Sequence, residues 1–249
     1  MNGTATKGQS GVKPTQPVNP WGSSLDKLKE WDPQGAELLL RMGANPWNSG
    51  VLPRKEVELI SLALYCACTN LDEAGTRRHI RAALDAGATR DEVLWVLKGA
   101  GVVLAMHSCS LGAPILLEEM KAAGVKAGGG AKPKTPACDE LRALGQWNTA
   151  WDPFYELSPL WTEELFAFAL GSMYKSGIFA PKFIELISIA FDASITHMYA
   201  PGTRRHIKGA LKAGATPEEI MAVLHICVSM GIQACVKGVP ILAEELERK

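Results

Sequence analysis

Two glutamate and histidine pairs at equal spacing are the residues of this chain best suited to acid–base chemistry. Glu58 lies 21 positions before His79, and Glu185 lies 21 positions before His206. An imidazole that is hydrogen-bonded to a carboxylate can take up or release a proton near neutral pH. Both glutamates border apolar helix faces, where an unpaired carboxylate is costly to bury. We therefore expect two catalytic pairs, and a purely structural pair copied by duplication is the alternative.

Side chains close to the two histidines are candidates for substrate binding. Arg78 and Arg205 directly precede the histidines, and a guanidinium can hold a carboxylate through two hydrogen bonds. Salt bridges on a solvated face are the alternative. His197 and Tyr199 have no residue of the same type at the matching positions of the first half of the chain. Because duplicated enzymes often specialise one copy, we expect the second site to be the more active one.

The charge balance limits the classes of partner. The chain has 26 basic and 26 acidic side chains, so no overall field attracts nucleic acid or an anionic membrane. Any small anionic substrate must be held by local cations. No apolar run reaches the ~18 residues that span a bilayer, and the first 20 residues lack a secretory pattern. We expect a cytoplasmic protein without membrane association.

The cysteines do not show the spacing of a redox centre. Cys66 and Cys68 fall on different sides of a helix, whereas Cys109 and Cys235 lie within apolar helical patterns. All four are expected to pack as small apolar residues. No set of His, Cys and Asp has metal-ligand spacing, and no glycine-rich phosphate loop follows a strand. We expect neither a metal nor another cofactor.

A long internal repeat organises the chain. The hexapeptide Gly75–Ile80 returns unchanged as Gly202–Ile207, and 12 of the 15 positions from Gly75 to Thr89 are identical in the second copy. The repeat therefore predicts two related modules. The predicted organisation is a flexible N-terminal arm over residues 1–23, a first module over 24–124, a linker rich in Gly and Pro over 125–137 and a second module over 138–249.

The apolar periodicity within each module is helical. After Pro53 the apolar residues fall on one helix face, and a second such face begins at Ile80. Thr89 and Thr216 each precede a glutamate by three positions, which predicts a capping box and a third helix. We expect Pro114 and Pro240 to begin a short final helix. No segment supports a strand, so the predicted fold class is all-α.

These features resemble the carboxymuconolactone decarboxylase family of the AhpD-like superfamily. The resemblance rests on Glu-Leu-Ile, the later histidine, and Ala-Gly-Ala-Thr before a capping box, and it covers about residues 50–122 and 177–247. It implies an internally duplicated AhpD-like helical bundle. Redox members carry Cys-x-x-Cys-x-x-x-His. The segments that precede the two histidines, Asn70–Gly75 and His197–Gly202, contain no cysteine.

The resemblance implies a cofactor-independent, decarboxylase-like lyase that acts on a small carboxylated lactone or unsaturated acid from aromatic catabolism. Isomerisation or lactone opening would use the same groups. The glutamate would orient and tune the histidine, and arginine would hold a spectator carboxylate. A protonated histidine would stabilise the developing oxyanion or deliver the proton. The family also implies a homotrimer, with six modules in all. An AhpD-like thiol peroxidase or disulfide reductase and a non-catalytic oligomeric binding protein are the alternatives.

Overall fold

The computed structural model describes residues 17–126 and 133–248 of the chain, and every regular element in these two ranges is helical. The first module begins with short helices and ends with a long one. Its elements are the 3-10 helix η1 (Gly22–Leu25), α1 (Asp26–Trp31), α2 (Pro33–Gly43), α3 (Asn45–Asn48), α4 (Arg54–Tyr65), α5 (Glu73–Asp85), α6 (Arg90–Val102) and α7 (His107–Ala122).

The second module repeats this order after one additional helix, α8 (Pro136–Ala143). Its further elements are the 3-10 helix η2 (Thr149–Trp151), α9 (Asp152–Leu157), α10 (Pro159–Ala169), the π-helical turn η3 (Leu170–Tyr174), α11 (Pro181–Ala193), α12 (Ala200–Lys212), α13 (Pro217–Ser229), the 3-10 helix η4 (Met230–Ile232) and α14 (Gln233–Glu247). The all-α duplicated fold predicted from the sequence is therefore confirmed.

The same local chemistry positions the central helices of both modules. Thr89 and Thr216 each accept a hydrogen bond from the backbone of the glutamate three positions later, and that glutamate bonds back to the threonine backbone. Both predicted capping boxes are thus present at the starts of α6 and α13. Lys55 and Lys182 then bind these two glutamates at 2.8 and 2.7 Å, which ties α4 to α6 and α11 to α13.

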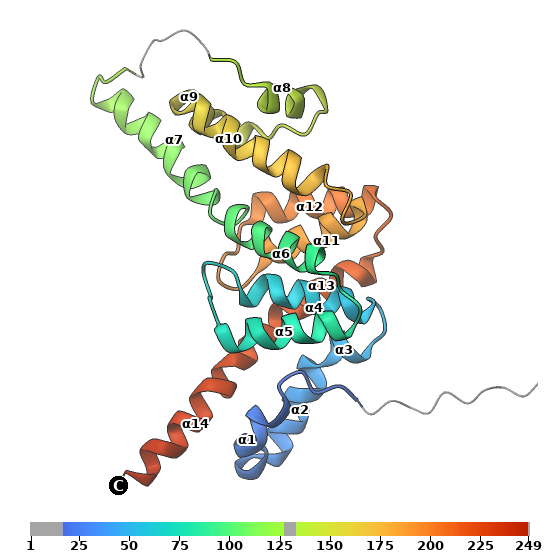
Figure 1. Ribbon diagram of the computed structural model, residues 1–249. Coiled ribbons are helices and arrows are strands. Elements are labelled where there is room, and N and C mark those ends of the chain that lie inside the picture. The colour runs from blue at the N-terminus through green and yellow to red at the C-terminus, as the bar shows by residue number, and fades with distance from the viewer. Residues whose placement is uncertain (1–16, 127–132, 249) are drawn as a thin grey trace, which may run out of the picture.

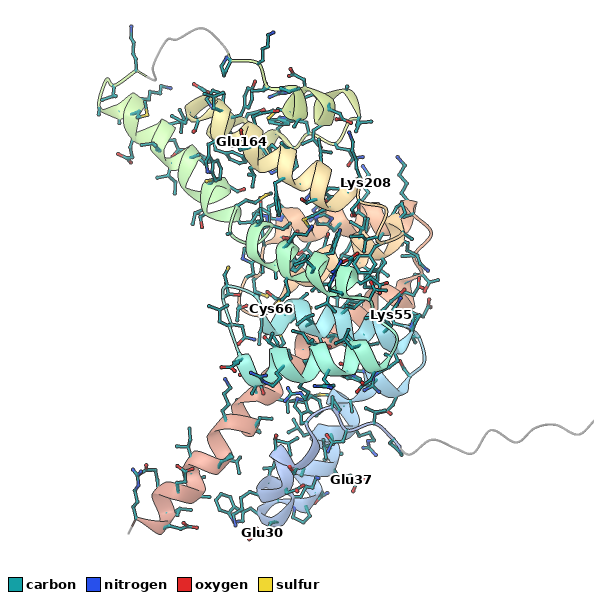
Figure 2. All side chains as sticks on the ribbon, viewed as in Figure 1. Glu30, Glu37, Lys55, Cys66, Glu164 and Lys208 are labelled. Atoms are coloured by element: carbon teal, nitrogen blue, oxygen red, sulfur yellow. The ribbon has the colours of Figure 1, made fainter. Side chains whose placement is uncertain are left out.

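The two modules share one hydrophobic core. Helix α4 packs against α11 and α13 as well as against its own neighbours α5 and α6. Leu59 and Trp95 of the first module belong to the same buried cluster as Leu186 and Phe191 of the second. Figure 1 shows these helices stacked in the centre of the molecule. In Figure 2, Lys55 and Cys66 mark the two ends of α4 within this stack.

The last helix of each module packs on the other module. Helix α7 contacts α9, whereas α14 contacts η1 and α1. In Figure 1 these two long helices extend to opposite ends of the molecule. Each end has its own small apolar cluster, in which Met106 joins Trp151 and Phe166 at one end and Ile232 joins Trp21 and Leu25 at the other. This exchange brings the starts of α7 and α14 to the sites described below.

Three sequence-based boundaries differ from the structure. Residues 17–23 of the predicted flexible arm pack on the fold, because Trp21 is buried against Trp47; residues 1–16 lie outside the described residues. The predicted linker 125–137 already contains the start of α8 at Pro136, and residues 127–132 of it are not described. Pro114 and Pro240 do not begin the final helices but lie inside α7 and α14, one turn or more from their starts.

Two helical stretches, Arg90–Ala122 and Pro217–Glu247, are long and apolar enough to span a membrane by length and composition alone. Each of them also supplies core residues, for example Trp95 and Ile226. Core helices of soluble proteins pass the same test, so these stretches are weak support for a membrane protein.

Candidate functional site

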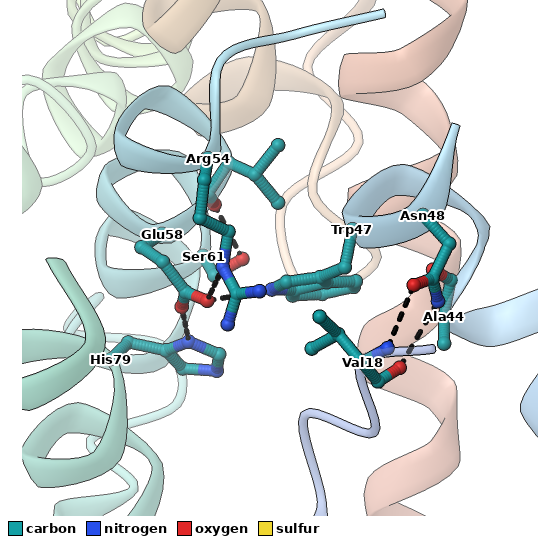
Figure 3. Close-up of polar contacts among 9 residues, drawn as sticks. Val18, Ala44, Trp47, Asn48, Arg54, Glu58, Ser61 and His79 are labelled. Carbon is teal, nitrogen blue, oxygen red and sulfur yellow. Dashed lines mark hydrogen bonds and ion pairs between the residues drawn. The ribbon is translucent and has the colours of Figure 1, made fainter. Parts of the chain in front are cut away.

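The first glutamate and histidine pair is held rigidly inside the first module. Glu58 Oε2 lies 2.7 Å from His79 Nδ1, and both side chains are buried. The other carboxylate oxygen, Oε1, accepts hydrogen bonds from Trp47 Nε1 at 2.8 Å and Arg54 Nε at 2.6 Å (Figure 3). The rings of Trp47 and Tyr65 lie 6.2 and 4.7 Å from the His79 ring. This arrangement fixes the imidazole on several sides.

The second pair has the same central contact but different surroundings. Glu185 Oε2 lies 2.7 Å from His206 Nδ1. The positions that correspond to Trp47 and Arg54 hold Tyr174 and Pro181. The carboxylate of Glu185 is therefore less enclosed: its side chain is 23% exposed, against 1% for Glu58. The structure confirms both predicted contacts across two helices, and it leaves the glutamate of the second pair more exposed than that of the first.

The two arginines turn inwards rather than to solvent. Arg205 Nη2 lies 2.8 Å from His206 Nε2, and because a guanidinium can only donate, Nε2 is the acceptor. His206 is therefore neutral, with its Nδ1 proton directed at Glu185. Arg205 Nε, together with Arg78 Nε and Nη2, is buried without a hydrogen-bond partner among the described residues. Solvated salt bridges do not account for these guanidinium groups, although they do for Arg77.

The direction of the histidine pKa shifts agrees with this geometry. Burial is the largest cause, and it lowers the pKa of both His79 and His206 even though the partner glutamates act in the opposite direction. The adjacent arginines lower the pKa values further. Both shifts favour the neutral imidazole in the resting protein, so a histidine that delivers a proton must first take one up during the reaction.

Tyr199 and His197 lie around a third histidine instead of next to His206. His107, the first residue of α7, has its Nδ1 atom 2.5 Å from His197 Nε2, and its ring lies 4.1 Å from the Tyr199 ring. The Nε2 atom of His107 faces the buried Asp192 at 3.6 Å. The second site is therefore completed by a residue of the first module.

The same cluster contains Asp192, which sequence reasoning did not single out. Its Oδ2 atom lies 3.6 Å from His206 Nε2, so it borders the catalytic candidate as well. Burial raises the pKa of Asp192 to about 7 against the opposing effect of Arg205. Burial also disfavours the charged form of His107 and lowers its pKa to about 3. Asp192 replaces Tyr65 of the first module, and this break in the repeat is the sequence signal that could have revealed it.

Two open grooves on the described surface are not lined by residues of these pairs. One groove of about 550 Å³ lies along the outer side of α12 and includes Thr203, Arg204 and Ile207. A second groove of about 390 Å³ lies along α5 and includes Thr76, Arg77 and Ile80. Neither groove is lined by the two pairs. The proposed acid–base residues therefore lie in the interior of each module and not in these two grooves.

The thiols remain separate from this chemistry. Burial raises the pKa values of Cys66, Cys138 and Cys227 to about 12. Protonated thiols are weak nucleophiles. The six cysteines are free in the described structure, and Cys68 is exposed.

Fold and site together define a duplicated AhpD-like helical protein in which each module has a glutamate and histidine pair, with no Cys-x-x-Cys motif before either histidine. The model of the carboxymuconolactone decarboxylase family matches residues 33–111 and 159–244, so the chain belongs to that family. A crystal structure from Burkholderia xenovorans LB400, named provisionally as a gamma-carboxymuconolactone decarboxylase subunit, is 33% identical, with a TM-score of 0.78. The alignment covers 90% of this chain and 91% of that chain. No curated protein matches the chain at comparable significance.

Proposed function

We propose that this protein is a cofactor-independent lyase that decarboxylates a small carboxylated lactone or a related unsaturated acid. The family supports a decarboxylase-like or AhpD-like activity, and the site supports the choice of a proton-transfer reaction over thiol chemistry. The reaction is assigned to the second module, with Glu185, His206 and Arg205 as the acting residues.

One observation carries this proposal. Arg205 is half-buried and contacts His206 of the second pair, and its buried Nε atom has no hydrogen-bond partner in the described part of the chain. A guanidinium is a strong receptor for a carboxylate, especially away from water. A small organic anion bound there would place its reactive carbon next to an imidazole.

The proposed reaction breaks the carbon–carbon bond to the carboxyl group. Carbon dioxide leaves, and the electron pair of that bond moves into the conjugated carbonyl to give a dienolate. Arg205 holds a part of the substrate that does not leave, and one of its N–H groups stabilises the negative charge on the dienolate oxygen. When Arg205 turns to the substrate, His206 Nε2 is free to take up a proton from solvent, and Glu185 stabilises the imidazolium that forms. This proton is then transferred to carbon, which completes the reaction without a redox change.

A neutral His206 in the resting site supports a second candidate function, which is also a proton-transfer reaction without a cofactor. Once Arg205 turns to the substrate, the Nε2 lone pair of His206 is available as a base, and a reaction that begins with proton abstraction next to a carbonyl would use it directly. Isomerisation of an unsaturated lactone is such a reaction. Release of carbon dioxide distinguishes the two candidates.

Self-association is part of this proposal. Apolar side chains remain exposed on the two exchanged helices, among them Leu111 and Leu116 on α7 and Ile241 and Leu242 on α14. Exposed apolar faces of this kind are typical of subunit interfaces. We propose a homotrimer in the cytoplasm, in which a neighbouring subunit covers these faces.

The function is tested with a carboxylated muconolactone as the first substrate. Carbon dioxide release and the product are measured together in D₂O. Decarboxylation predicts one carbon dioxide and one carbon-bound deuterium for each turnover. Product formation without carbon dioxide would replace decarboxylation by isomerisation, and the absence of any turnover with a panel of carboxylated lactones would contradict the lyase proposal.

A further inference from the structure

Asp192 has a buried carboxyl group to which the described residues form no hydrogen bond. Its side chain is 1% exposed, and both carboxylate oxygens lack a hydrogen-bond partner among the described residues. A buried carboxylate without a partner is costly. The position therefore calls for a ligand or a proton.

The first module has a carboxylate at the same place. Asp72 and Tyr65 have exchanged chain positions relative to Tyr199 and Asp192. A Cβ atom at the glycine of the first module (residue 75) would lie 2.5 Å from the Asp72 carboxylate, and one at the matching glycine of the second module (residue 202) would lie 2.1 Å from the Asp192 carboxylate. The two carboxylates thus rest against equivalent glycines.

In the first module a cation occupies this place. Lys237 Nζ lies 3.0 Å from Asp72 Oδ1, and Gln233 Nε2 donates to Asp72 Oδ2 at 2.5 Å. Both residues come from α14. The equivalent positions of α7 hold Leu111 and His107. Leucine cannot supply the charge, and histidine supplies a nitrogen ligand instead of an amide donor.

The second module gathers a set of metal ligands at this place. His107 Nε2 lies 3.6 Å from Asp192 Oδ1, His107 Nδ1 lies 2.5 Å from His197 Nε2, and one donor atom from each of the three side chains lies within 4.8 Å of the others. We propose that Asp192, His107 and His197 bind one divalent transition-metal ion, which takes the place that the Lys237 ammonium holds in the first module.

The donor types and distances fit such an ion. Zinc bonds of 2.0 to 2.2 Å at tetrahedral angles place two ligand atoms about 3.3 Å apart, close to the 3.6 Å that separates His107 from Asp192. His197 must give up its hydrogen bond to His107 and turn towards the ion. It can do so because it is only partly buried, in the segment between α11 and α12. Two imidazoles and one carboxylate favour zinc, cobalt, nickel or iron over calcium and magnesium.

The neighbouring arginine does not argue against a cation here. Arg205 occupies the position that Arg78 has in the first module. There the ammonium of Lys237 sits on Asp72 while Arg78 lies over the Tyr65 ring next to it. The equivalent pocket therefore accommodates a cation and a guanidinium together.

The inference does not rest on the proposed function: none of Glu185, His206 and Arg205 is among the proposed ligands, and binding is measured without turnover. The full-length protein is freed of metal with EDTA, dialysed and titrated with Co²⁺ while its visible absorption is recorded; Zn²⁺ is then added as a competitor. We expect one Co²⁺ ion for each chain, an absorption band typical of low coordination number, and its displacement by Zn²⁺. Asp192→Asn and His107→Gln should each weaken binding by at least about 100-fold.

Matched variants provide the controls. Asp72→Asn alters the equivalent carboxylate of the first module, and His225→Gln removes an exposed histidine; neither should change the affinity for Co²⁺. His197→Asn, at a partly buried position, covers the case in which the buried variants do not fold. Absence of Co²⁺ binding by the wild-type chain, or unchanged affinity in folded Asp192→Asn or His197→Asn, would overturn the proposal.

Discussion

At the scale of residues, one repeated pair has two different settings. Glu58 accepts three hydrogen bonds and His79 lies between aromatic rings, whereas Glu185 is partly exposed and His206 meets Arg205. The contact between glutamate and histidine is 2.7 Å in both modules. The pair itself therefore does not decide its role, and we propose that the neighbouring residues give the first pair a structural role and the second pair a catalytic role.

His79→Gln tests the structural role. Removing a buried hydrogen bond to a charged partner should cost about 1–3 kcal/mol and lower the melting temperature. Turnover of the folded protein should stay unchanged. A drop in turnover at an unchanged melting temperature would show that the first pair is catalytic instead.

The pH dependence of stability offers a second test of the same residue. Because burial lowers the pKa of His79 in the folded state, the unfolded chain binds more protons below its own histidine pKa of about 6.5. The stabilisation is therefore complete above that pH and is lost as the pH falls below it. Melting temperatures measured between about pH 7.5 and 5.5 should decline less steeply for His79→Gln. Identical slopes for the variant and the wild type would contradict this shift.

Thiol alkylation distinguishes proton transfer from peroxidase chemistry. Iodoacetamide should label the exposed Cys68 first, because burial keeps Cys66, Cys138 and Cys227 protonated. Mass spectrometry locates the label, and turnover should survive it. Loss of turnover that Cys68→Ser prevents would reveal a catalytic or site-blocking thiol.

At the scale of elements, the crossing of α11 and α12 leaves room for Glu185. A Cβ atom at Gly209 would lie 2.6 Å from the Glu185 carboxylate. The first module has Ala82 at the equivalent position and holds Glu58 towards Trp47 and Arg54 instead. The exchange of alanine for glycine at this one position therefore allows Glu185 to take a different position from Glu58.

Gly209→Ala should therefore separate activity from stability. Alanine in a helix interior stabilises by up to about 1 kcal/mol relative to glycine, while the added methyl group displaces Glu185 from His206. We expect turnover to fall by about 10-fold or more with little loss of melting temperature. Full activity in Gly209→Ala would show that the position of Glu185 is not critical.

Some helices of the fold could be predicted from the sequence and others could not. The capping threonines, the periodic helices after Pro53 and the repeated hexapeptide predicted the central helices, because each is a local signal. Helices α1–α3 and α8–α10 were not predicted, since their segments carry neither the repeated hexapeptide nor a capping box. The contact of His107 with Asp192 depends on α7 packing on the other module, which no local pattern encodes.

At the scale of the whole molecule, the exchange of α7 and α14 makes each module necessary for the site of the other. It also leaves apolar residues on both helices exposed in the single chain. The proposed homotrimer explains how these faces are covered. Light scattering at micromolar concentration should give the mass of three chains.

Charge on these faces should break the assembly. Leu116→Glu and Leu242→Glu each place a carboxylate on an exposed apolar position, which is costly if the position is buried between subunits. We expect dissociation to monomers or dimers, while circular dichroism shows intact helices. A wild-type chain that remains monomeric would contradict the trimer, and unchanged mass in both variants would remove these faces from the interface.

The central claim, catalysis by the second pair, is tested most directly by turnover and melting temperature of His206→Gln beside His79→Gln. With a carboxylated lactone that the wild-type protein decarboxylates, we predict that His206→Gln lowers turnover by at least about 100-fold. His79→Gln should retain turnover and lose stability. Normal turnover for each folded His206→Gln chain, with a lower melting temperature as its only defect, would contradict the account.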